Sequence, residues 1–239
     1  FNAYMLPTPV SEVPYMLVTA EEMHKQQQKR MGEEAAWVKK EFGIEVDTQV
    51  RLGIASDEIR HLVSENAIDL GVMGMKGENG VEKMIGSTTT NVVRKIKTPV
   101  LIVPQDATFQ PLDRIVYATD FSYKGTHHLF DPMLALIRKF SATVQILHIT
   151  LSHSSEHPDT LMGKKEIEQI FQPVSHVFVT IEHTSVTQGV NEFLSSHPSS
   201  LLVMVAHRHT FFERIFAKNH TTAMAYETHL PLLVLQDKG

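Results

Sequence analysis

Short apolar runs alternate along the chain with longer segments in which apolar side chains recur every three or four residues. The runs are typical of buried strands and the longer segments of amphipathic helices, as Ile59, Leu62 and Val63 illustrate. Continuous apolar strands that alternate with helices indicate an α/β fold, in which helices cover both faces of a parallel sheet. Strands are expected at 1–6, 45–52, 70–73, 100–103, 113–118, 143–149, 176–181, 201–205 and 232–235, and helices at roughly 19–42, 55–66, 125–140 and 186–195.

The second half of the chain repeats the first. When Pro99 is set against Pro231, an offset of 132 residues, the apolar runs coincide without a gap and Gly71 falls on Val203. Each half then has a buried strand, a polar loop, a helix whose start is rich in Ser, Thr or Asn, and a last strand after a proline. The predicted domains are a first repeat at 1–105, a linker at 106–112 and a second repeat at 113–239.

The first repeat is shorter at its start. The segment 113–146, which gives the second repeat its opening strand and helix, has no counterpart before the strand at 1–6. A first repeat without that strand would leave two strand edges unpaired. We therefore expect that the natural protein carries roughly 35 further residues before Phe1, or that another chain supplies the strand.

Composition narrows the function classes. With 22 basic and 27 acidic residues, a net charge of -5, the chain lacks the basic surplus expected of a nucleic-acid-binding protein. The longest apolar runs, such as 99–104, are much shorter than the ~20 residues that cross a bilayer, so no membrane partner is expected. No cysteine is present, which is compatible with the reducing cytoplasm, where we expect the protein to act.

One glycine motif has the character of a phosphate-binding loop. Gly74 and Gly77 follow the strand at 70–73 and, after eight intervening residues, Gly86 precedes Ser87 and Thr88 at a helix start. Glycines let the backbone approach a phosphate, and the free N–H groups of a helix start favour an anion. The same residues also suit a tight turn and a helix N-cap, which is worth about 1 kcal/mol.

The second repeat does not keep this motif. The offset of 132 places Ala206, His209 and Lys218 on the three glycines, so close approach of the backbone to a phosphate is not expected there. Basic side chains at 207–209 and 218 could hold an anion instead, or Lys218 could itself take the place of the phosphate's charge partner.

Neither a metal site nor a catalytic site is predicted. His207 and His209 have strand-like spacing, and His148, His153 and His157 are clustered, but no acidic or cysteine partner stands at a recognised ligand interval. No G-x-S-x-G elbow occurs, so a Ser-His-Asp hydrolase is not indicated. We expect a protein that is not an enzyme.

The glycine motif and the Pro99-Val-Leu-Ile-Val run after it resemble the universal stress protein family, as does the Thr119-Asp120-Phe121-Ser122 turn. The resemblance covers almost the whole chain as a tandem pair. It implies two units with parallel sheets in strand order 3-2-1-4-5, the first without its opening strand and helix. It also implies that the units pair through their last strands, so we expect 100–103 to meet 232–235 about a pseudo-two-fold axis within one chain.

The resemblance also names a ligand. Nucleotide-binding members carry G-x-x-G-x9-G-S/T, so ATP or another adenine nucleotide is the implied ligand of the residues Gly74, Gly77, Gly86, Ser87 and Thr88, although the spacing here is one residue short. Asp120 corresponds to the carboxylate that lies near the adenine and ribose. Its alternative role is to cap the following helix or to close the Asp-Phe-Ser turn.

These observations favour a binding or regulatory module of the stress response, with an unknown protein partner and weak or no nucleotide binding. An alternative is an ATP-binding stress protein that uses the Gly74, Gly77, Gly86 and Ser87 loop and hydrolyses ATP slowly at most. A third is a purely structural pseudo-dimer that presents a surface to partners.

Overall fold

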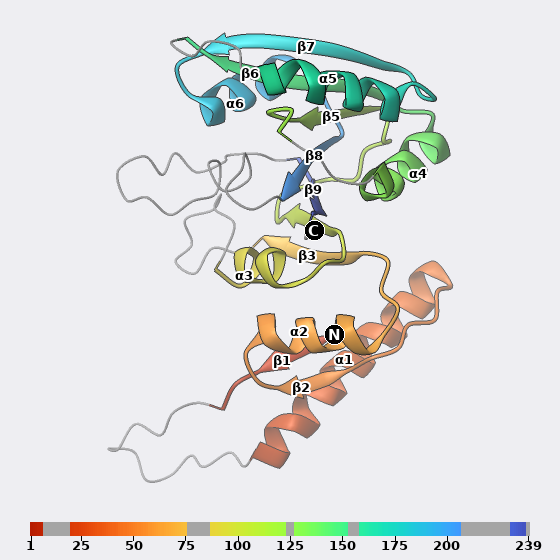
Figure 1. The fold of residues 1–239 in the computed structure, drawn as a ribbon. Coiled ribbons are helices and arrows are strands. Elements are labelled where there is room, and N and C mark those ends of the chain that lie inside the picture. The colour runs from red at the N-terminus through yellow and green to blue at the C-terminus, as the bar shows by residue number, and fades with distance from the viewer. Residues whose placement is uncertain (7–19, 76–86, 123–126, 153–157, 207–229, 238–239) are drawn as a thin grey trace. The chain divides into compact units, whose positions relative to one another are not determined.

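The computed structural model describes residues 1–6, 20–75, 87–122, 127–152, 158–206 and 230–237 (Figure 1). The chain forms two compact units, Phe1–Asn66 and Ala67–Gly239, which are described one at a time. Their boundary differs from the boundary between the sequence repeats, because the second unit also contains the last two strands of the first repeat.

The first unit is a two-stranded parallel sheet with two helices. Strands β1 (Asn2–Tyr4) and β2 (Val50–Leu52) pair with Ala3 opposite Arg51, and the helices are α1 (Ala20–Phe42) and α2 (Ala55–Glu65). The helices lie close to the predicted positions. The strand expected at 45–52 is reduced to β2, and the side chain of Val46, an apolar residue of the expected strand, is exposed.

The second unit is built on one sheet of seven strands. Its order is β3-β4-β9-β8-β5-β6-β7. The strands of the second repeat, read as β7-β6-β5-β8-β9, have the predicted order 3-2-1-4-5, and all neighbours among them are parallel. The bounds are β3 (Gly71–Met75), β4 (Val100–Pro104), β5 (Arg114–Ala118), β6 (Thr143–Leu151), β7 (His176–His183), β8 (Leu201–Ala206) and β9 (Leu232–Gln236).

The last strands of the two repeats meet in the middle of this sheet. β4 and β9 are antiparallel neighbours, with Leu101 opposite Leu233. The predicted contact between these strands is therefore present. Because every other neighbouring pair in the sheet is parallel, β3 and β4 run in the opposite direction to the five strands of the second repeat.

The ungapped offset of 132 is wrong for β3 and β8. Gly71 donates its backbone N–H to the carbonyl of Pro99, and Leu202 donates to the carbonyl of Pro231, both at 2.9–3.0 Å. The structural equivalent of Gly71 is therefore Leu202, at an offset of 131, and Gly74 corresponds to Val205 in place of Ala206. The second repeat has one residue more than the first between its last two strands.

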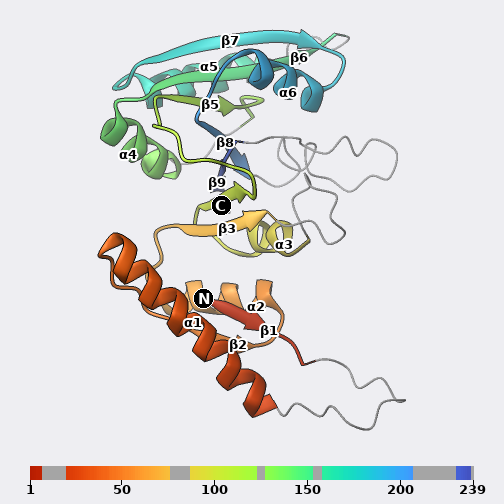
Figure 2. The same cartoon turned by 180° about the vertical axis from the view of Figure 1, so that it is seen from behind.

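In the part of this unit that the structure describes, four helices and a 3₁₀ turn surround the sheet. They are α3 (Ser87–Lys95), η1 (His127–Phe130), α4 (Asp131–Phe140), α5 (Pro158–Phe171) and α6 (Val186–Ser196), and the sequence pattern did not predict α5. Figures 1 and 2 show α5 and α6 on opposite faces of the sheet, as expected for a sheet buried on both sides. Tyr117, Phe130 and Phe171 form an aromatic cluster in the core, with ring centroids 5.4–5.8 Å apart.

Two strands of the first repeat each have only one neighbour. Of the strands in the described ranges, β1 pairs only with β2, and β3 pairs only with β4 and ends the seven-stranded sheet. These are the two unpaired edges predicted for a repeat without its opening strand. Among the described residues, no helix is long and apolar enough to cross a membrane.

Candidate functional site

The glycine motif of the first repeat lies at the carboxyl end of β3. Gly74 is the fourth residue of β3, and Ser87 and Thr88 are the first two residues of α3. Gly77 and Gly86 lie outside the residues that the structure describes. The predicted succession of strand, loop and helix start is therefore present, with the loop itself undescribed. Thr88 is exposed and Thr89 is buried, so α3 turns its second residue toward solvent.

Asp120 closes a turn directly after β5. Its Oδ1 accepts hydrogen bonds from the backbone N–H of Ser122 at 3.0 Å and from the Ser122 hydroxyl at 2.6 Å. Thr119 Oγ1 accepts from the N–H of Phe121 at 3.0 Å, and Phe121 has a φ of 58°. A short polar side chain that bonds the backbone two residues ahead is typical of turns. The alternative of a turn-closing aspartate is thus observed, whereas binding of a nucleotide by Asp120 stays a prediction.

Side chains and a glycine from two further elements hold this turn. His148 of β6 donates Nδ1–H to the carbonyl of Thr119 at 2.9 Å, since that carbonyl can only accept. The His148 ring lies 4.8 Å from the ring of Phe121. Gly163 of α5 lies so close to Phe121 that a Cβ there would overlap the Phe121 carbonyl oxygen. His148 lies in the strand predicted at 143–149, and its side chain is half-buried.

The structure does not bring the candidate residues together. Gly74 is at the carboxyl end of β3 and Asp120 follows the carboxyl end of β5. Because β3 and β5 run in opposite directions, their carboxyl ends point to opposite sides of the sheet along the strand direction. The strands are also four places apart, which corresponds to about 19 Å across the sheet. Gly74 and Asp120 therefore belong to two separate places.

A buried amide near the carboxyl end of β9 was not found from the sequence. Gln236 is 6% exposed, lies opposite Ala206 of β8, and neither atom of its amide group has a hydrogen-bond partner in the described part of the chain. Such an amide can donate and accept at once. In the sequence, Gln236 is only a polar residue that follows the apolar run 230–235. Many exposed strand ends have the same pattern, so the sequence provided no reason to expect a buried amide.

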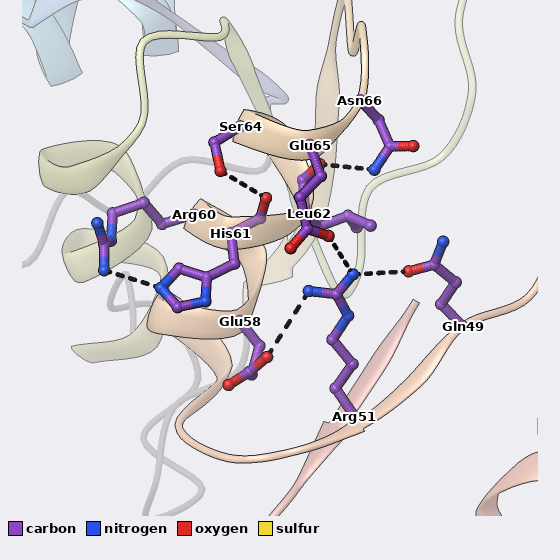
Figure 3. Close-up of polar contacts among 9 residues, drawn as sticks. All are labelled: Gln49, Arg51, Glu58, Arg60, His61, Leu62, Ser64, Glu65 and Asn66. Atoms are coloured by element: carbon purple, nitrogen blue, oxygen red, sulfur yellow. Dashed lines mark hydrogen bonds and ion pairs between the residues drawn. The ribbon is translucent and has the colours of Figure 1, made fainter.

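The first unit contains a cluster of charged residues around Arg51 (Figure 3). The Arg51 guanidinium on β2 lies 2.6 Å from Glu65 and 3.8 Å from Glu58, both on α2, and donates to Gln49 at 3.3 Å. The hydrogen bond to Glu65 raises the pKa of Arg51, and the same bond lowers the pKa of the Glu65 carboxyl. The cluster ties β2 to α2, and its charges are already paired with one another.

The histidines do not assemble into a metal site in the described part of the chain. No group of three or more His, Asp or Glu side chains there could hold a metal ion. His148 uses Nδ1 to hold Thr119, as described above. His153, His157, His207 and His209 lie outside the described residues.

A model of the universal stress protein family matches residues 3–104 and 111–236. Two curated relatives, both universal stress proteins of Methanocaldococcus jannaschii, are each 33% identical to the chain, over 64 and 70 residues. The matches cover 26% and 28% of this chain and 38% and 43% of the relatives, so the chain spans about two fifths of their length.

Solved structures share the fold. A universal stress protein from Archaeoglobus fulgidus superposes with a TM-score of 0.69 at 18% identity, over 93% of this chain and 84% of that one. A protein of unknown function from Pseudomonas aeruginosa gives a TM-score of 0.60 at 11% identity, over 98% and 92%. At these identities the likeness shows the architecture alone.

Proposed function

This chain belongs to the universal stress protein family, and we propose that it is a binding or regulatory module of the stress response that binds ATP weakly or not at all and catalyses no reaction. We further propose that it acts in the cytoplasm through a protein partner. The absence of cysteine and the net charge of -5, which offers no general attraction to nucleic acid or to anionic membranes, support this assignment.

The observation that carries the proposal is that the two parts of a nucleotide site lie in different repeats, the glycine loop that begins at Gly74 in the first and Asp120 in the second. A nucleotide site of the kind implied by the sequence needs a phosphate loop and a carboxylate for the base and ribose in one place. Here the loop that begins at Gly74 lies on one side of the sheet, at the carboxyl end of β3. The Asp120 carboxylate lies on the opposite side, beyond the carboxyl end of β5. In addition, Asp120 Oδ1 already accepts two hydrogen bonds from Ser122 within its own turn.

A comparison of binding free energies supports weak binding of ATP. The start of α3 alone contributes only about 0.3–1 kcal/mol toward an exposed anion. A micromolar complex needs roughly 8 kcal/mol. The second repeat has Val205 at the place of Gly74, and its side chain replaces the hydrogen that would let the backbone approach a phosphate.

The second candidate function is ATP binding at the first repeat, with slow hydrolysis at most. It is favoured by the position of Ser87 and Thr88, which begin α3 after the carboxyl end of β3. This is the arrangement in which a loop delivers phosphate to a helix start. In this reading Gly74, Gly77, Gly86 and Ser87 bind phosphate.

We also propose that the two repeats act as a single-chain pseudo-dimer. The antiparallel pairing of β4 with β9 supports it, because an antiparallel pair of equivalent strands is what a two-fold axis generates. In such an assembly the last strands cover each other, so a second chain is not needed to cover them.

Calorimetric titration of the whole chain with ATP and Mg²⁺ tests the function. We expect no saturation up to about 1 mM, which corresponds to less than roughly 4 kcal/mol. Two variants identify the site if binding is found: Gly86→Lys places a side chain in the first-repeat loop, and Asp120→Asn keeps an oxygen for the turn while removing the charge.

Each outcome of the titration is decisive. Micromolar binding that Gly86→Lys abolishes would replace the proposal by the second candidate. Micromolar binding that survives Gly86→Lys but is lost in Asp120→Asn would place the site in the second repeat. Circular dichroism spectra that match the parent chain are the control for folding of both variants.

A further inference from the structure

The outer strand of the second repeat, β7, has an open backbone edge. It ends the seven-stranded sheet and, among the strands in the described ranges, pairs only with β6 (Figures 1 and 2). In the order 3-2-1-4-5 the strand numbered 3 lies on the outside, and β7 is that strand in a repeat that contains all five. Its counterpart in the first repeat, β2, also pairs with a single described strand. The open edge therefore belongs to the architecture of the repeat and does not result from a strand that the repeat lacks.

The backbone of β7 shows which residues can bond to a further strand. Val144 of β6 donates its N–H to the carbonyl of Ser175, and Ser152 donates to that of His183, so residues 175 and 183 face β6. Backbone groups of successive residues point to alternate sides of a strand. The N–H and C=O groups that point to the open side are therefore those of His176, Phe178, Thr180 and Glu182.

The two ends of this edge carry opposite charges on the face covered by α5. His176 is on this face, because its ring lies 6.4 Å from that of Phe171 in α5, and by alternation Phe178 and Glu182 share it. Lys164 of α5 lies over Phe178, with its Nζ 5.1 Å from the ring centroid. Glu182, toward the other end of the strand, is exposed and forms no ion pair within the described part of the chain.

A second copy of β7 can pair with this edge in an antiparallel register about a two-fold axis. The backbone groups of the two strands meet only where outward residues lie opposite outward residues. One register of this kind places Val179 opposite its own copy, Phe178 opposite Thr180 and His176 opposite Glu182. All four outward residues of each copy are then paired.

Opposite charges meet in this register. Glu182 of one copy lies opposite His176 of the other and diagonal to Phe178, over which Lys164 extends. Diagonal neighbours in an antiparallel pair are about 7–8 Å apart, which a long side chain such as lysine can span. Because the axis is two-fold, the contact between Lys164 and Glu182 forms twice, and neither carboxylate faces the other.

The face of β7 that is turned toward α6 is complementary in the same register. Val177 is 47% exposed, and the register sets it opposite Ile181 of the second copy. Apolar side chains that lie directly opposite each other stabilise neighbouring strands. A shift of two residues in one direction would set Val177 opposite His183, and a shift in the other would set Glu182 opposite Val174. Of these three registers, only the first suits both faces.

We propose that two copies of the chain associate through their β7 edges, antiparallel and about a two-fold axis at Val179. The charge pattern favours a second copy as the occupant because the edge is complementary to itself, with its cation and its carboxylate exchanged by the axis. Main-chain hydrogen bonds would give the affinity, and the charges would fix the register. The proposal rests on no property of nucleotide binding, so it and the proposed function can fail separately.

Sedimentation velocity of the whole chain at rising concentration, up to about 1 mM, measures the association. We expect a reversible dimer. Glu182→Lys and Lys164→Glu should each weaken it at least about tenfold, because each variant sets like charges against each other twice. Both side chains are exposed, so both variants should fold, which circular dichroism checks.

An equimolar mixture of the two variants is the most specific sample. In a mixed pair, the lysine introduced by Glu182→Lys faces the glutamate introduced by Lys164→Glu, and the unchanged Lys164 and Glu182 face each other. We expect the mixture to associate at least about tenfold more tightly than either variant alone. A general effect of net charge would not produce this recovery.

Two further pairs of variants test the backbone contact and the register. Thr180→Pro removes an outward N–H, which an edge strand tolerates, and should weaken the dimer at least about tenfold, whereas Thr180→Val should not. The chain has no cysteine, so Val179→Cys should form a disulfide between two copies, whose Cα atoms would be about 4.5 Å apart. Ile181→Cys is the control, because it would lie about 13 Å from its copy along the strands.

Four results would overturn the proposal. They are a chain that stays monomeric at every concentration, a dimer that neither charge reversal weakens, a mixture of the two variants that does not recover association, and equal oxidation of Val179→Cys and Ile181→Cys.

Discussion

Leu101 and Leu233 lie directly opposite each other in the antiparallel pair of β4 and β9. They are also equivalent residues of the two repeats, since they follow Pro99 and Pro231 at the same distance. The flanking pairs, Val100 with Val234 and Ile102 with Leu232, exchange when the repeats are exchanged. This register is symmetric, as it would be if a two-fold axis passed between Leu101 and Leu233.

Gly163 is predicted to be required in α5. An alanine inside a helix normally stabilises it relative to glycine, but a Cβ at Gly163 would overlap the carbonyl oxygen of Phe121. We expect Gly163→Ala to lower the free energy of unfolding by roughly 1–3 kcal/mol, the usual cost of overpacking. Thermal unfolding followed by circular dichroism measures it.

Gly32 of α1 is the matched control for Gly163. A Cβ there would meet no atom within 4 Å, so Gly32→Ala should stabilise the first unit by about 0.5–1 kcal/mol. If Gly163→Ala were as stabilising as Gly32→Ala, the close approach of α5 to the turn after β5 would be wrong.

Asp120 is predicted to stabilise the second unit through its turn. Asp120→Ala removes the acceptor of both hydrogen bonds from Ser122 and should cost about 1 kcal/mol of unfolding free energy. Asp120→Asn keeps an acceptor oxygen and should cost less than half as much. Urea unfolding compares the two variants, and equal losses would show that the charge, and not the turn, is what matters.

The ion pair between Arg51 and Glu65 predicts a pH dependence of the first unit. The pKa of Glu65 is lowered from its ordinary value of 4.5 by the hydrogen bond from Arg51. Its stabilising contribution is therefore fully present above pH 4.5 and is lost as the pH falls through the lowered pKa. We expect Glu65→Gln to be less stable than the parent chain at pH 7, with a difference that shrinks toward zero in acid and in high salt.

Trp37, the single tryptophan, lies in α1 and reports on this unit by its fluorescence during urea unfolding. Glu58→Gln is the matched control, because Glu58 lies farther from Arg51, at 3.8 Å, and should lose less. A pH-independent difference for Glu65→Gln would contradict the assigned ion pair.

Several elements of the fold could be predicted from the sequence because they carry strong local signals. The runs at 100–103 and 232–235 each follow a proline and are entirely apolar, and both form strands as predicted. Helix α5 was missed because the exposed Leu161 and Met162 lie off the face that buries Ile167 and Phe171, which blurs its periodicity.

The register between the repeats could not be read from the sequence. The run Leu201–Ala206 is apolar throughout, so a shift of one residue sets one apolar side chain on another and leaves no visible mismatch. The hydrogen bonds of Gly71 and Leu202 to the two prolines, together with the register of the strands, fix the offset at 131.

The sequence assigns Gly74 to the first repeat and Asp120 to the second, but it does not give the relative direction of the strands that precede them. Gly74 and Asp120 each follow an apolar strand, as the sequence indicates. That the two strands run in opposite directions within one sheet follows only from the antiparallel pairing of β4 with β9.

The most direct test of this account is a disulfide between positions 101 and 233. The N–H groups of Gly71 and Leu202 bond to Pro99 and Pro231, so by alternation Leu101 and Leu233 point their backbone groups away from each other. Residues in such a pair have Cα atoms about 4.5 Å apart, which a disulfide can bridge. The chain has no cysteine of its own, so Leu101→Cys combined with Leu233→Cys provides the only two thiols. We expect complete oxidation within the monomer, detected by intact mass and thiol titration, and little oxidation of the register-shifted control Leu101→Cys with Leu235→Cys. Cross-linking between chains only, or equal oxidation of the control pair, would contradict the pairing of the two repeats through their last strands.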